Sequence, residues 1–161
     1  MTRSLTEALH LVRRFFGHLR ARPLGPADQQ YVHAHLRGRC AELFWAQSTG
    51  DQRHAVDVAR RVASALPGDD EAIQAALLHD VGKIEARLGP VGRSLATILD
   101  AMHLPLSKRM ADYRRHGALG AVLLESAGCA PLAVTFALHH PAPAPEGVAR
   151  TRWDALVHAD G

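Results

Sequence analysis

The sequence predicts an all-α protein. Aromatic residues make up only 5% of the 161 residues, and the apolar residues are mainly alanine, leucine and valine, a composition that favours helices over sheets. Apolar residues recur at helical spacing along most of the chain, and no stretch shows the alternation of a half-buried strand. The length fits one domain with a core of ordinary size.

Three helices are expected in the first 50 residues. The first follows a capping box that begins at Ser4, and the proline-containing stretch after Arg22 interrupts the helical pattern. We interpret residues 1–50 as a helical cap packed on a site domain formed by residues 51–161. The three helices are expected at about residues 5–20, 27–36 and 39–47.

In the site domain, helices are expected wherever an apolar stripe follows a capping residue. Asp51 is the expected N-cap of the first helix, and Asp69 or Asp70 is the expected N-cap of the second. The polar stretch 107–115 is expected to form a short helix or loop across the mouth of the site. The remaining helices are expected at about residues 91–102, 116–128, 130–138 and 151–159.

The most informative segment is His79-Asp80-Val81-Gly82-Lys83, which closes an apolar helical run. An imidazole and a carboxylate at the end of one helix can reach two metal ions held close together. The imidazole would bind one ion and the carboxylate would bridge both. Gly82 suits a left-handed helix stop, which would leave Lys83 free to turn back towards whatever the metals hold.

Eleven histidines are a large number for a chain of this length. Several of them, and one further aspartate, fall at the ends of expected helices, where they could face one centre. Imidazole and carboxylate ligands suit iron, manganese, cobalt, nickel or zinc, and the sequence does not choose among these metals. The residues that complete this constellation are His54, His116, His139, His140 and Asp160.

This pattern resembles the HD-domain superfamily of metal-dependent phosphohydrolases, which is defined by an H…HD…D arrangement. The HD-V-G-K form and the later paired histidines are similar to the HD-GYP branch and to small stand-alone bacterial HDIG proteins. The match covers about residues 51–160, and residues 116–124 resemble the family's H-x-x-x-G-x-x-L-L stretch. The resemblance implies an HD-domain helical bundle with an N-terminal helical cap.

The resemblance also implies two divalent metal ions and a set of site residues. Iron or manganese is expected, with zinc, cobalt, nickel or magnesium as alternatives. Asp80 and Lys83 would be the catalytic residues, and Lys83 would contact phosphate. The first ion would be held by His54, His79, Asp80 and Asp160, and the second by Asp80, His116, His139 and His140. Further phosphate contacts are expected from Arg53, Arg93 and Arg115.

The implied reaction is in-line hydrolysis of a phosphomonoester or phosphodiester in a small phosphorylated or nucleotide-like substrate. The metals and Lys83 would neutralise the charge that develops on the phosphate. Pro141-Ala142-Pro143 stands where cyclic-dinucleotide phosphodiesterases carry Gly-Tyr-Pro, which argues against a cyclic dinucleotide. Gly50 stands where some relatives carry a glutamate for a third metal, so two metals are expected.

Two other functions remain open at this point. HD-type di-iron oxygenases share the His/Asp ligand set and the lysine. The adjacent His139 and His140 argue for a hydrolase, because two donors there would fill positions that oxygen chemistry needs open. The second alternative is a non-catalytic signalling or binding domain, which would bind no metal or leave no open position on it.

Composition bears on partners and on compartment. The formal net charge is +3, and the basic residues form no long block and are not interleaved with aromatic residues, so no specific nucleic-acid partner is expected. No apolar run has the length of a membrane span. Cys40 and Cys129 lack metal-like spacing and are expected as reduced thiols of a cytoplasmic protein. The sequence does not indicate an oligomeric state.

Overall fold

The computed structural model describes residues 22–86, 88–89, 92, 95–96, 99 and 104–161. Over these residues the chain forms helices joined by turns and loops, without any β-strand. The all-α prediction is therefore confirmed. The helix expected at residues 5–20 lies outside the described residues, and so does most of the helix expected at residues 91–102.

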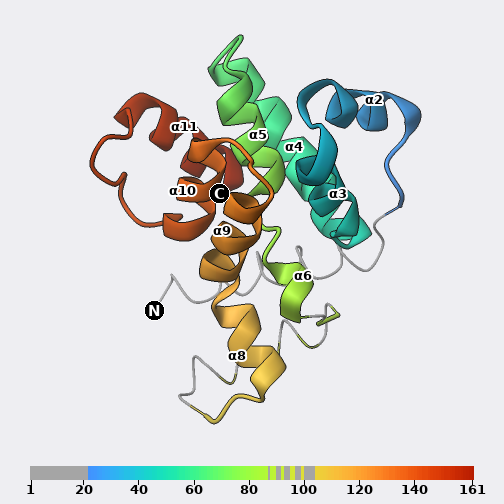
Figure 1. The fold of residues 1–161 in the computed structure, drawn as a ribbon, viewed down its shortest axis with the longest axis vertical. Helices are drawn as coiled ribbons and strands as arrows, with labels where there is room; N and C mark the ends of the chain where they lie inside the picture. Colours follow the sequence, from blue (N-terminus) through green and yellow to red (C-terminus); the bar gives the residue numbers. More distant parts are fainter. Residues whose placement is uncertain (1–21, 87, 90–91, 93–94, 97–98, 100–103) are drawn as a thin grey trace, which may run out of the picture.

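The helices follow the expected order, with ends that differ by a few residues from the predicted ones (Figure 1). The helices are α2 (Pro26–His35), α3 (Gly38–Ala46), α4 (Thr49–Ala65), α5 (Asp70–Leu78), α6 (Lys83–Ala86), α8 (Lys108–Arg114), α9 (His116–Ser126), α10 (Pro131–His139) and α11 (Arg150–Asp160).

Side-chain caps fix the starts of the two helices that carry the first site residues. The hydroxyl of Ser48 accepts a hydrogen bond of 3.3 Å from the backbone N–H of Asp51, so Ser48 is the N-cap of α4. The prediction that Asp51 is this N-cap is wrong, because the helix begins two residues earlier and encloses Asp51 in its first turn. Asp69 caps α5 by accepting from the N–H of Ala72 at 3.0 Å, as one of the two alternatives predicted.

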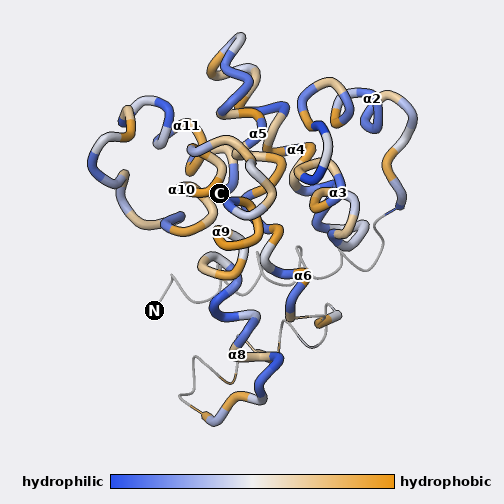
Figure 2. Tube along the Cα trace, viewed as in Figure 1, coloured by the Kyte–Doolittle hydropathy of each residue, from blue (hydrophilic) through white to orange (hydrophobic). Residues whose placement is uncertain are grey.

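Helix α5 lies at the centre of the bundle and packs against α4, α10, α11, α2 and α3 (Figure 1). Its alanine, isoleucine and leucine side chains between residues 72 and 78 are almost wholly buried. The hydropathy colouring shows hydrophobic residues concentrated on α9 and α10, whereas α8 is largely hydrophilic (Figure 2). A central helix that is apolar on all sides is expected when neighbours cover every face. The carboxyl end of α5 therefore lies in the interior of the bundle.

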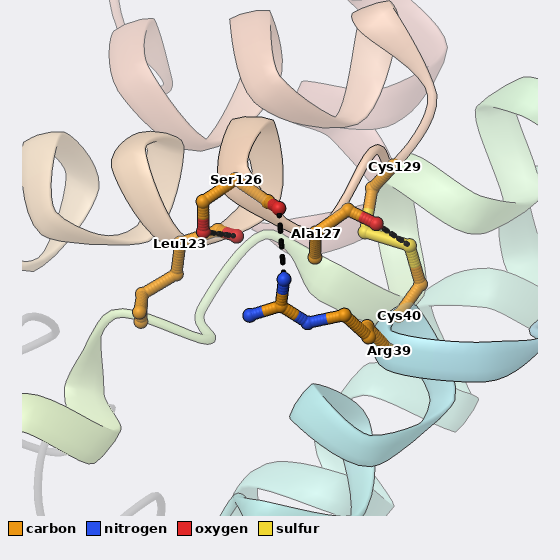
Figure 3. The surroundings of a disulfide bond; sticks show 6 residues. All are labelled: Arg39, Cys40, Leu123, Ser126, Ala127 and Cys129. Atoms are coloured by element: carbon orange, nitrogen blue, oxygen red, sulfur yellow. Dashed lines mark hydrogen bonds between the residues drawn. A yellow bond between two sulfur atoms is a disulfide. The ribbon is translucent and has the colours of Figure 1, made fainter.

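The two described N-terminal helices pack on the rest of the bundle, and their buried residues belong to the same hydrophobic core. A disulfide between Cys40 on α3 and Cys129, in the turn before α10, joins these parts of the chain (Figure 3). Beside it, the guanidinium of Arg39 donates to the carbonyl of Ser126 at 3.2 Å. The prediction of reduced thiols is wrong, because packing brings the two Cα atoms to 5.8 Å, within the range that a disulfide spans.

Disulfides persist mainly in oxidising compartments. The bonded cysteines therefore remove one of the arguments for a cytoplasmic protein. Among the described residues, none of the helices combines the length and the apolar character that crossing a membrane would require.

Candidate metal centre

The centre is built at the carboxyl end of α5. The helix ends at Leu78, and residues 79–82 form a turn in which the N–H of Val81 donates to the carbonyl of Leu78 at 3.1 Å. His79 and Asp80 are buried, with exposed fractions of 1% and 4%. Groups of this polarity are rarely buried so fully unless they have partners. Their partners come from α4, α9, α10 and α11.

Three histidines of the centre are held in the same manner by the backbone. The Nδ1 atoms of His79, His116 and His140 donate to the carbonyls of residues 76, 113 and 136 at 2.9, 2.7 and 2.9 Å. These bonds fix the ring orientation and direct each Nε2 atom towards the centre, where it could bind a cation once it carries no proton. Metal-binding histidines commonly have such a bond on the second nitrogen.

The histidine rings gather around His79. The ring centroid of His79 lies 5.5 Å from that of His54 and 5.3 Å from that of His140. The Oδ1 atom of Asp160 lies 2.9 Å from the Nε2 atom of His54 and 3.2 Å from that of His79. Three sets of donor atoms, each with all members within 4.8 Å of one another, result from this packing. They are His54, His79 and Asp80; His79, His140 and Asp160; and Asp80, His116 and His140.

Asp80 belongs to two of these sets and directs a different oxygen to each side. Its Oδ2 atom lies 3.4 Å from the Nε2 atom of His79, and its Oδ1 atom lies 3.5 Å from the Nε2 atom of His116. A carboxylate in this position can bind one cation through each oxygen. Asp80 thus links His79 on one side with His116 on the other, whereas the third set joins His140 to His79 and Asp160, which the prediction assigned to different ions.

Glycines let α9 approach both the turn after α5 and helix α10 closely. A Cβ atom on Gly82 would stand 1.9 Å from the carbonyl oxygen of His116, and one on Gly117 would stand 2.7 Å from the carbonyl oxygen of Ala137. Gly82 is not among the described glycines with positive φ. The prediction of a left-handed helix stop at Gly82 is therefore wrong, and the residue is required instead for contact between backbones.

The carboxylates keep their negative charge despite burial. Burial raises the pKa of Asp80, but the positive charges of Lys83 and His79 outweigh it and hold this pKa well below its usual range. Burial also raises the pKa of Asp160, but hydrogen bonds from His54 and His79 hold it below the usual range. Both groups are therefore carboxylates at neutral pH and can act as ligands.

The histidines differ in their protonation. Burial lowers the pKa of His79, but the carboxylates of Asp80 and Asp160 outweigh it and raise this pKa to about 10. Burial lowers the pKa of His116 and of His140 and is the largest effect at both. His116 and His140 are thus neutral near pH 7, whereas His79 carries a proton that a cation would have to displace.

Lys83 lies at the centre, beside Asp80. It is buried, with an exposed fraction of 9%, and its Nζ atom donates to Oδ2 of Asp80. The same Nζ atom lies 4.0 Å from Oδ1 of Asp51. Lys83 thus turns back towards the centre, where two buried carboxylates enclose its ammonium, and its contact with phosphate stays a prediction. Asp51 was missed as a site residue, although its place one turn before His54 on α4 was a usable signal.

Three other predicted residues, His139, Arg53 and Arg115, do not lie at this centre. His139 is exposed and lies outside the three donor sets, because neighbouring residues at a helix end point in different directions. The guanidinium of Arg53 donates to the carbonyls of Arg22 and Pro23 on the surface. Arg115 is exposed and pairs with Asp112 at 3.1 Å. Arg93 lies outside the described residues.

Comparison of the chain with protein-family models, with curated proteins and with solved structures gives no match. A functional hypothesis therefore depends on the chemistry of the residues gathered at this centre and on the motif that they form in the sequence.

Proposed function

We propose that the protein is a metal-dependent phosphohydrolase that holds two divalent cations and acts on a small phosphorylated or nucleotide-like substrate. The observation that carries the proposal is the position of Asp80, whose two oxygens face different histidines at 3.4 and 3.5 Å. Two cations held by the residues on either side of Asp80 would be able to act on the same phosphate.

The donor atoms fit two cations of this kind. His54, His79, Asp80 and Asp160 would hold the first, and Asp80, His116 and His140 would hold the second. Nitrogen and oxygen donors of this type suit iron, manganese, zinc, cobalt or nickel. The backbone bonds that orient the histidine rings support the fit, because they hold the Nε2 atoms in place before a cation binds.

Two cations in such a site would supply Lewis-acid activation of the phosphate and a nucleophile for in-line displacement. The chain's own residues would do the rest. The burial of His79 and Asp80 would strengthen the electrostatic interactions that these two residues make inside the site. Lys83 would contribute a buried positive charge beside Asp80, which would offset negative charge on a bound phosphate.

One observation favours a second candidate, a di-iron oxygenase. His139 is exposed and outside the donor sets, so the second cation would have only Asp80, His116 and His140 as ligands among the described residues. Open positions on this cation suit oxygen activation as well as hydrolysis. The argument from paired histidines against an oxygenase therefore no longer applies.

The test uses protein purified with chelator and then loaded separately with Mn²⁺ and, without oxygen, with Fe²⁺. Two model substrates, nitrophenyl phosphate and bis(nitrophenyl) phosphate, report on phosphomonoester and phosphodiester hydrolysis. Release of nitrophenol or inorganic phosphate from them should depend on the added metal. Asp80→Asn should abolish it, whereas His158→Ala, which removes an exposed histidine on α11, should not. Oxygen consumption without phosphate release would overturn the proposal in favour of the oxygenase.

A further inference from the structure

Asp51 is a buried carboxylate that the predicted ligand set does not use. It lies in the first turn of α4 and has an exposed fraction of 1%. The hydroxyl of Ser48 donates to its Oδ2 atom at 2.5 Å. Its other oxygen, Oδ1, lies 4.0 Å from the Nζ atom of Lys83. A carboxylate this deeply buried is costly to the fold unless its charge is compensated.

Lys83 therefore lies between two carboxylates, of which Asp80 belongs to the proposed metal ligands and Asp51 does not. Its Nζ atom donates to Oδ2 of Asp80, the same oxygen that faces His79. A divalent cation bound by His79 and Asp80 would need this oxygen. An ammonium and a divalent cation on one oxygen repel each other strongly in a buried site. The ammonium must leave Oδ2 when a cation binds there.

We propose that Asp51 is a positioning residue that receives the Lys83 ammonium when a cation binds Asp80, and so keeps Lys83 beside the site. The inference builds on the proposed function. The distance of 4.0 Å is already within the range of an ion pair, so a small rotation of the flexible lysine side chain completes the transfer. Lys83 then stays charged and buried next to the cations, where it can contact an anionic substrate.

Ser48 binds the oxygen of Asp51 that does not face Lys83. Its hydroxyl binds Oδ2 of Asp51, which leaves Oδ1 directed at Lys83. Ser48 and Asp51 also satisfy each other as a helix-capping pair. A purely structural account of Asp51 is therefore available, in which it only stabilises the start of α4. The two accounts differ in one respect, because the capping role does not depend on Lys83.

A double-mutant cycle distinguishes the positioning role of Asp51 from a purely structural one. Full-length wild type, Asp51→Asn, Lys83→Met and the double variant are prepared without metal, and Mn²⁺ affinity is measured by calorimetric titration. Lys83→Met should bind Mn²⁺ more tightly than wild type, since the competing ammonium is gone. Asp51→Asn should weaken binding about tenfold when Lys83 is present, which is typical of coupled buried neighbours, and less than about threefold in the Lys83→Met background.

Equal weakening by Asp51→Asn in both backgrounds, or no weakening in either, would overturn the inference. Ser48→Ala serves as the matched control, because it removes the cap and keeps the carboxylate. It should lower the thermal stability while the coupling between Asp51 and Lys83 persists. If wild type itself binds no Mn²⁺, Fe²⁺ or Zn²⁺, the proposed function fails, and this outcome is distinct from binding that lacks the coupling.

Discussion

The disulfide between Cys40 and Cys129 should supply a large part of the free energy of unfolding. It joins residues separated by 89 positions and so closes a loop that contains most of the bundle. Loss of loop entropy in the unfolded chain corresponds to about 4.6 kcal/mol for a loop of this length at 25 °C. Single domains have a net stability of about 5–15 kcal/mol, so reduction should remove about a third of it or more.

The effect should arise in the unfolded chain, because the native contacts near the disulfide do not depend on it. Helix α3 packs on α5, and Arg39 donates to the carbonyl of Ser126, and neither contact includes a disulfide atom. The reduced protein should therefore keep its helical content in buffer and unfold at lower denaturant concentration. Reduction should also expose more surface on unfolding, which would raise the dependence of the free energy on denaturant.

The assay is urea unfolding with chelator present, followed by far-UV circular dichroism before and after reduction. For a denaturant dependence of about 2 kcal/mol per molar, the midpoint should fall by about 2.3 M. The Cys40→Ala, Cys129→Ala double variant is the control, and its midpoint should not respond to the reductant. A shift below about 0.5 M in the wild type, or two free thiols per unfolded chain without reductant, would refute the reasoning.

Three further predictions concern the centre. Gly82→Ala should destabilise the fold by at least about 3 kcal/mol, since its Cβ would stand 1.9 Å from the carbonyl oxygen of His116, and a thermal midpoint like that of wild type would contradict this. Metal-free protein, kept with chelator, should become less stable to urea as pH rises from about 6.5 to about 10. The folded chain holds a proton on His79, whose pKa is raised to about 10, and the unfolded chain does not. A free energy of unfolding that rises over this range would refute the raised pKa of His79. His140→Ala should lower the metal content measured by elemental analysis, whereas His139→Ala should leave it near the wild-type value, and equal losses would show that both are ligands.

Local patterns in the sequence were sufficient to predict the helices and many of the residues that the structure gathers at the candidate centre. Adjacent His79 and Asp80 at the end of an apolar run necessarily lie at one level of the fold, wherever that run is packed. The structure gathers His54, His116 and Asp160 around them, although these residues come from three other helices. At a helix end, a single polar residue can point into a bundle without interrupting an apolar face. Most of the histidines and aspartates of the centre lie near helix ends, so their pattern could be recognised in the sequence.

Features that depend on how helices face one another could not be read in this way. Cys40 and Cys129 are separated by 89 residues, and only the packing of α3 near the turn before α10 shows that they can bond. The choice between His139 and His140 depends on the rotation of α10 about its axis, which adjacent identical residues do not reveal. Lys83 contacts Asp80, which is local in the sequence, and also Asp51 of α4, and only the packing of α4 reveals this second contact.

The most direct test of the central claim is the metal content per chain of protein purified without chelator or oxygen, compared with two variants. The account predicts about two ions per chain in wild type and close to none in Asp80→Ala, because Asp80 belongs to both of the ligand groups proposed above. His116→Ala should retain about one ion, since it removes a ligand from one group only. Less than about half an ion in wild type, or a content that neither variant changes, would contradict a two-metal site built on Asp80.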